Sequence, residues 1–91
     1  MKVYISLPIT GKDIEEQKRH AGDVASFLLA AGHTPVSPFN NGLDDNASYE
    51  DHLREDLKML LDCDAILMCK GYHLSNGCTF ERDVAIKCGL T

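Results

Sequence analysis

The stretch that ends in Glu81 combines residue types that bind ligands with one that can react. Residues 74–81 (LSNGCTFE) hold a serine and an asparagine able to cap a helix, a glycine that lets backbone N–H groups approach a ligand, and a threonine hydroxyl. The free N–H groups and the dipole of a helix start favour an anion. A plain helix cap without any ligand accounts for the same residues about equally well.

Glu81 is the candidate nucleophile or base, although a glutamate in a first helical turn more often only complements the helix dipole. Asp56 flanks the apolar stripe of the preceding helix, where a solvated surface carboxylate is the commoner role. Tyr4, inside the first strand, is either a core residue or a hydroxyl that reaches the site. Cys78 lies near the same site without an evident base, which makes it a weak candidate for a thiol nucleophile.

The histidines and cysteines show no spacing typical of a metal site. The chain has four of each, and it contains no CxxC pair and no HExxH motif. We expect surface or turn positions for the histidines and free thiols for the cysteines. Since GxGxxG and P-loop motifs are missing too, we expect no metal and no cofactor.

Apolar periodicity predicts three successive pairs of a strand and a helix. We expect strands at residues 2–6, 33–37 and 64–69, and helices at 12–31, 48–62 and 78–89. This alternation predicts an α/β fold of the three-layer Rossmann or flavodoxin-like type, with a parallel sheet, as a single domain over residues 1–91. The most apolar strand, 64–69, is expected at or near the centre, and Pro35 favours an edge position for strand 33–37.

The connecting loops determine where a ligand would bind in this fold. Loops 6–12, 37–48 and 70–78 follow the carboxyl ends of the strands, and parallel α/β sheets bind their ligands there. The sequence ends where a fourth strand would follow the last helix, and a three-stranded sheet leaves an open edge. We therefore expect either a shortened version of the fold or a homo-oligomer in which a partner chain completes the layer.

Composition excludes several classes of partner. The formal net charge of −5 argues against nucleic acid, whose backbone favours a basic surface. No apolar run approaches the roughly 20 residues of a membrane helix, so we expect no membrane partner. The first residues read directly into a strand rather than a signal peptide, and together with free thiols this predicts a cytoplasmic location.

Four segments resemble, in order and spacing, the nucleoside 2-deoxyribosyltransferase superfamily and, more narrowly, the DUF4406 family. They are residues 3–11 (VYISLPITG), 32–38 (GHTPVSP), 56–57 with 60–65 (DL and LLDCDA), and 75–81 (SNGCTFE). Superfamily members with known activity cleave or transfer the N-glycosidic bond of deoxyribonucleosides or their 5′-monophosphates. The resemblance therefore implies the same fold and a nucleoside or nucleotide as the small-molecule partner.

The resemblance also implies roles by position. Glu81 matches the glutamate that attacks the anomeric carbon, Asp56 the aspartate that binds the sugar and assists proton transfer, and Tyr4 the tyrosine that orients the glutamate. Ser75 matches a serine that contacts the 5′-phosphate in deoxynucleotide hydrolases. The full set of expected substrate-binding residues lies in two loops: Ser6, Ile9, Gly11, Ser75, Gly77 and Cys78.

The first loop departs from the hydrolases, which carry a Gly-Ser-Ile-Arg type sequence there. This chain has Leu-Pro-Ile-Thr at residues 7–10, so the arginine is missing and Lys12 is the only nearby substitute. In active relatives a neighbouring subunit's C-terminal region also completes the site. The sequence ends before any such segment. We therefore keep two alternatives to the glycosidase or transferase: a non-catalytic nucleotide-binding domain and an assembly module of the same fold.

Overall fold

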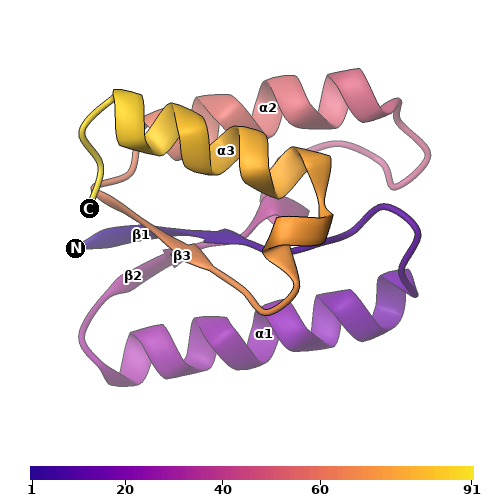
Figure 1. Ribbon diagram of the computed structural model, residues 1–91. Helices are drawn as coiled ribbons and strands as arrows, with labels where there is room; N and C mark the ends of the chain where they lie inside the picture. Colours follow the sequence, from indigo (N-terminus) through magenta and orange to yellow (C-terminus); the bar gives the residue numbers. More distant parts are fainter.

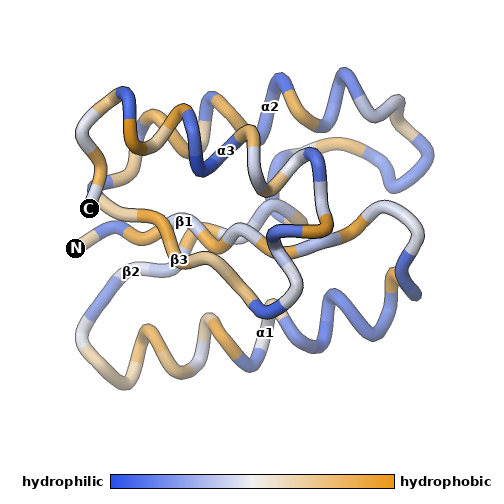
Figure 2. Tube along the Cα trace, in the orientation of Figure 1, coloured by the Kyte–Doolittle hydropathy of each residue, from blue (hydrophilic) through white to orange (hydrophobic).

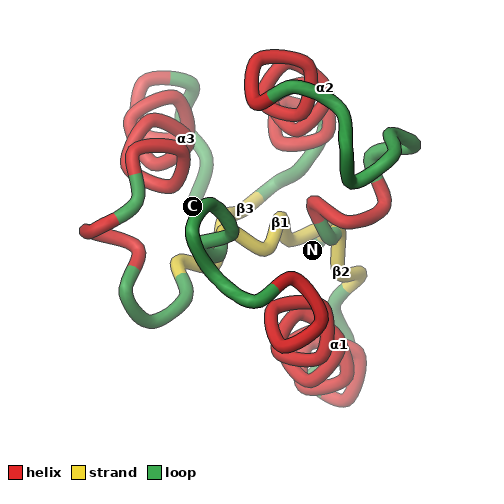
Figure 3. Tube along the Cα trace, turned by 90° about the vertical axis from the view of Figure 1, so that its right-hand side faces the viewer, coloured by secondary structure: helices red, strands yellow, loops and turns green.

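Three parallel strands form the sheet on which the whole chain is built. The computed structural model describes all residues, 1–91. The strands are β1 (Lys2–Ser6), β2 (Thr34–Val36) and β3 (Ala65–Met68), and the helices are α1 (Ile14–Ala30), α2 (Tyr49–Leu61) and α3 (Asn76–Lys87). Figure 1 shows α1 on one face of the sheet and both α2 and α3 on the other, and Figure 3 shows the same three layers from the side. The predicted three-layer parallel α/β fold is confirmed.

The strand order is β2-β1-β3, so the first strand lies at the centre. Tyr4 of β1 pairs in parallel with Val36 on one side and Ile66 on the other. The edge position of β2 is confirmed, whereas the strand 64–69, expected at or near the centre, lies at the opposite edge beside the central β1. The apolar side chains of β3 are only half-buried, because the strand has a neighbouring strand on one side alone.

The outer side of β3 is not entirely unpaired. The N–H of Thr91 donates to the carbonyl of Asp64 at 3.1 Å, and the N–H of Ile66 donates to the carbonyl of Thr91 at 3.2 Å. Thr91 thus bonds to the two residues that flank Ala65, and this is the hydrogen-bond pattern of parallel strands. The backbone of Thr91 therefore pairs with the outer side of β3.

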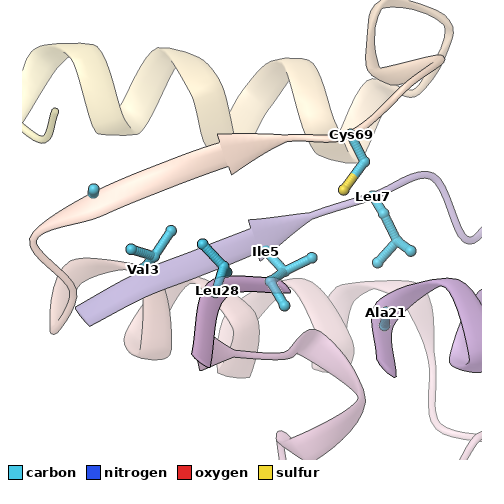
Figure 4. Close-up of a cluster of buried hydrophobic side chains, with 7 residues drawn as sticks. Val3, Ile5, Leu7, Ala21, Leu28 and Cys69 are labelled. Atoms are coloured by element: carbon cyan, nitrogen blue, oxygen red, sulfur yellow. The ribbon is translucent and has the colours of Figure 1, made fainter. Parts of the chain in front are cut away.

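Side chains of β1 alternate between two cores. Val3 and Ile5 point to the α1 face, where they pack with Ala21 and Leu28 (Figure 4). Tyr4 points to the opposite face and packs with Leu60 of α2 and Ala85 of α3. Because successive residues of a strand face opposite sides, the hydroxyls of residues 4 and 6 both lie under α2 and α3. This parity places polar groups of the central strand where they can reach a site.

Side-chain caps set the starts of the two helices that cover this face. Ser48 Oγ accepts from the N–H of Asp51 at 3.1 Å, as the capping pattern predicts. Ser75 Oγ accepts from the N–H of Cys78 at 3.3 Å, so α3 begins at Asn76, two residues before the predicted start. The apolar residues of the predicted helix 78–89 lead us to expect Phe80 and Cys88 on its inward face, which is wrong, because both side chains are exposed.

Apolar and polar residues recur in turn along each helix (Figure 2). Each helix therefore has an apolar face that packs toward the sheet. No helix is both long and apolar enough to cross a membrane.

Candidate functional site

A cavity of about 290 Å³ lies where the loops after the strands meet the starts of α2 and α3. This is the edge of the sheet at which α/β folds bind ligands. Most of the predicted site residues line it, namely Tyr4, Ile9, Asp56, Ser75, Gly77, Cys78 and Glu81. The two predicted carboxylates therefore come from separate helices and share one cavity.

Two hydroxyls of the central strand donate hydrogen bonds to the carboxylate of Glu81. Tyr4 Oη donates to Glu81 Oε2 at 2.7 Å, and Ser6 Oγ donates to Oε1 at 2.8 Å. The glutamate is only 6% exposed and is the sixth residue of α3. A role limited to complementing the helix dipole does not fit, because the carboxylate binds strand side chains and lies beyond the first turn.

Burial controls the ionisation of Glu81. Loss of solvent raises the pKa of its carboxyl to about 7, although the hydrogen bonds from Tyr4 and Ser6 act to lower it. The nearby charge of Asp56 raises the pKa of Glu81 further. Glu81 can therefore both hold and release a proton near neutral pH, as a reacting carboxylate requires.

Tyr4 serves as a fixed donor to this carboxylate. Its side chain is fully buried, and burial together with the charge of Glu81 raises the pKa of the phenol far above its ordinary value. The hydroxyl therefore stays protonated at any physiological pH. Of the two alternatives for Tyr4, the structure has both at once: the ring lies in the core and the hydroxyl reaches the cavity.

Asp56 is buried as well, with 9% of its surface exposed, so the commoner solvated position does not hold. Asn41 Nδ2 donates to Asp56 Oδ1 at 2.9 Å. Burial raises the pKa of Asp56 to about 6, while the hydrogen bond from Asn41 acts to lower it. The cavity thus holds two carboxyls that titrate close to neutrality.

The remaining predicted residues have different positions. Ser6 is not among the residues that line the cavity, but its hydroxyl donates to Glu81, which does. Gly11 lies outside the lining, in a turn whose φ of +79° favours glycine. Gly77 lines the cavity, and a Cβ there would lie 3.4 Å from the hydroxyl of Tyr49. Burial raises the pKa of the Cys78 thiol, which keeps this group protonated.

Sequence reasoning missed Asn41, Tyr49 and His52, all of which line the cavity. Tyr49, His52, Leu53 and Asp56 form one stripe of α2 at the spacing of neighbouring turns, and all four line the cavity. This spacing was the available signal for His52, which we expected on the surface. Nothing in the sequence around Asn41 shows that its side chain reaches α2, because it belongs to an irregular loop.

The lining is acidic. Asp45, Asp56 and Glu81 line the cavity, and neither a lysine nor an arginine does. Lys18 lies nearby, but its ammonium pairs with Asp45 at 2.8 Å and packs over the ring of Phe39. No group of three or more histidine, cysteine, aspartate or glutamate side chains is arranged to hold a metal ion.

These features define a class: a three-layer α/β protein with buried carboxylates at the carboxyl edge of its sheet, in the 2-deoxyribosyltransferase fold. The solved structure of a 2-deoxyribosyltransferase from the psychrotolerant bacterium Bacillus psychrosaccharolyticus is similar to this chain with a TM-score of 0.72. The two share 23% sequence identity, and the match covers 98% of this chain and 67% of the other.

The chain belongs to the DUF4406 family, a domain of unknown function, whose family model matches residues 1–91. No curated protein matches the sequence.

The raised pKa of Glu81 predicts how stability depends on pH. Between its unfolded pKa of about 4.5 and its folded pKa of about 7, the folded state holds a proton that the unfolded state has lost, so stability falls as pH rises across this range. This loss is about 3 kcal/mol, because each pKa unit corresponds to about 1.4 kcal/mol. Glu81→Gln stays neutral, so it should flatten the decline in unfolding free energy measured by urea titration at successive pH values.

Asp56 keeps its own smaller share of this pH dependence in the variant. Asp83→Asn, an exposed carboxylate on the same helix, is the matched control and should leave the decline unchanged. A Glu81→Gln protein with the wild-type pH dependence would show that the carboxyl is not desolvated.

Proposed function

We propose that the protein binds a deoxynucleoside and cleaves or transfers its N-glycosidic bond with Glu81 as the nucleophile. The observation that carries this proposal is the Glu81 carboxylate, which is bound on both oxygens by Tyr4 and Ser6 and lines one cavity together with Asp56. The fold of a 2-deoxyribosyltransferase supports it, since that enzyme's name describes the same chemistry.

The geometry suits a two-step reaction. The C1′–N bond breaks through an oxocarbenium-like state, whose positive charge a carboxylate stabilises. A Glu81 oxygen then bonds to C1′, and the leaving base takes up a proton from Asp56, which can hold one because the pKa of this carboxyl is raised to about 6. A water molecule or a second base next attacks C1′, restores the free carboxylate and returns a proton to Asp56.

Tyr4 and Ser6 hold the nucleophile in place for this attack. Each donates one hydrogen bond to a separate oxygen of Glu81, which fixes the plane of the carboxylate. Positioning of this kind removes orientational entropy before the reaction begins. Bonds to both oxygens also keep the charged form accessible in a buried place, where desolvation alone would keep the carboxyl protonated.

Loss of the nucleophile tests the activity directly. Wild-type protein incubated with a panel of deoxynucleosides should release free base, detected by chromatography, and Glu81→Ala should release at least about 100-fold less, because both steps use this carboxylate. Asp83→Ala, which changes an exposed carboxylate of the same helix, should keep the wild-type rate.

Equal release by wild type and Glu81→Ala would contradict the nucleophile assignment. Stabilisation of the wild type by a nucleoside in a thermal-shift assay, without any release of base, would instead favour the non-catalytic binding domain. A ligand present at one hundred times its Kd adds about 2.7 kcal/mol of stability.

The charge of the lining predicts the substrate. Asp56 and Glu81 repel a 5′-phosphate when they are charged, and no lysine or arginine lines the cavity; the nearby Lys18 is already paired with Asp45. Uncharged deoxynucleosides should therefore have a higher kcat/KM than their 5′-monophosphates, measured as base release from paired substrates. A preference for the monophosphates would contradict this and would point to the start of α3 as a phosphate site.

A further inference from the structure

Asn41 makes three hydrogen bonds that together fix its orientation. Its Oδ1 accepts from the N–H of Leu43 at 3.0 Å. Its Nδ2 lies 2.9 Å from Asp56 Oδ1 and also 2.9 Å from His52 Nδ1. Because an N–H of the backbone only donates and a carboxylate only accepts, the two neighbours assign the amide without ambiguity. Both hydrogens of the amide are then used, one on Asp56 and one on His52.

This orientation determines the proton position on His52. Nδ1 faces a donor, so it must be the unprotonated nitrogen of the ring, and a neutral imidazole then carries its hydrogen on Nε2. Nε2 makes no hydrogen bond to any other group of the chain, whereas Nδ1 is fully used. His52 is half-buried and lines the cavity.

We propose that Asn41 is a positioning residue for the cavity: it holds the Asp56 carboxylate and fixes His52 in the tautomer that offers Nε2–H to the ligand. His52 precedes Asp56 by one turn on the same face of α2, nearer the start of the helix. His52 therefore lines the same cavity as Asp56 and Glu81. The atom that a ligand presents to His52 must be a hydrogen-bond acceptor, such as a carbonyl oxygen or an unprotonated ring nitrogen of a nucleobase.

The kinetic part of this inference rests on the proposed function, whereas the tautomer does not. The tautomer of His52 can be measured in the protein without any ligand. Failure of the tautomer assignment can therefore be distinguished from failure of the proposed function. A carboxylate in place of the Asn41 amide is the sharpest variant. Asn41→Asp has the same shape and keeps an acceptor for the N–H of Leu43, which preserves the loop, but it has no hydrogen to donate to Asp56 or to Nδ1 of His52.

The first measurement is a long-range proton–nitrogen NMR spectrum of the free protein, labelled at histidine. Wild type should show His52 with its proton on Nε2 and none on Nδ1. In Asn41→Asp the new carboxylate accepts, so Nδ1 should gain a proton. Asn40→Ala, the exposed asparagine one residue earlier, should keep the wild-type pattern. A wild-type ring protonated on Nδ1, or a pattern that Asn41→Asp leaves unchanged, would overturn the proposal.

The second measurement is base release from the preferred deoxynucleoside. Asn41→Asp and Asn41→Ala should each lower kcat/KM by about 10- to 100-fold, the size expected for loss of a hydrogen bond to a charged group. His52→Phe removes the Nε2–H donor together with the Nδ1 acceptor of Asn41, and it should raise KM more than it lowers kcat because the donor acts in binding. Asn40→Ala should match wild type in both constants.

Thermal unfolding of each variant separates these effects from loss of the fold. If Asn41→Asp does not fold, Asn41→Ala carries both measurements, because it also removes the donor to Nδ1. Folded Asn41 variants with the kcat/KM of wild type would overturn the positioning role. A His52→Phe protein with unchanged KM would overturn the assignment of Nε2–H as a ligand donor.

Discussion

The site depends on one interaction that spans the molecule: two hydroxyls of the first strand bind the carboxylate of Glu81 in the last helix. Tyr4 and Glu81 are 77 residues apart in sequence, yet their side chains are within 2.7 Å. The contact exists because β1 occupies the centre of the sheet and presents residues 4 and 6 to the same face. A different strand order would separate these groups and leave a buried carboxylate without donors, at a cost of several kcal/mol.

Burial of the two carboxyls gives the cavity its chemical character. Both Glu81 and Asp56 have a raised pKa, to about 7 and about 6, and the charge of Asp56 contributes to the shift of Glu81. Carboxyls that affect one another titrate as a pair, and between these values the pair holds one proton. Since Glu81 has the higher pKa, this proton lies mainly on Glu81, so the proposed attack requires its transfer to Asp56. The same burial makes the folded protein less stable when these carboxyls are charged.

The fold was predictable because its signals are local. Alternating apolar periodicity marked three strands and three helices, Pro35 marked the edge strand, and Ser48 marked a helix start. The position of β3 was not predictable from its apolar composition, since Ala65–Met68 packs as an edge strand with half-buried side chains. The start of α3 was predicted two residues late, although Ser75, which provides the cap, was among the residues expected to cap a helix.

The site was predictable where the family resemblance reached and not beyond it. The resemblance singled out Tyr4, Asp56 and Glu81, and all three line one cavity. Asn41 belongs to an irregular loop, whose path depends on tertiary contacts. Its hydrogen bond to Asp56 could therefore not be predicted from the sequence. The expected homo-oligomer, the cytoplasmic location and the roles assigned by resemblance stay predictions.

The most direct test of the account is the ionisation of Glu81 itself. A carbon NMR titration of its side-chain carboxyl should give a midpoint near 7, because burial outweighs the two hydrogen bonds. In Tyr4→Phe the midpoint should move higher, since one of the donors that stabilise the charged form is lost. A midpoint near 4.5 in the wild type, unchanged by loss of the Tyr4 hydroxyl, would contradict the claim that a buried, strand-held carboxylate is the centre of this site.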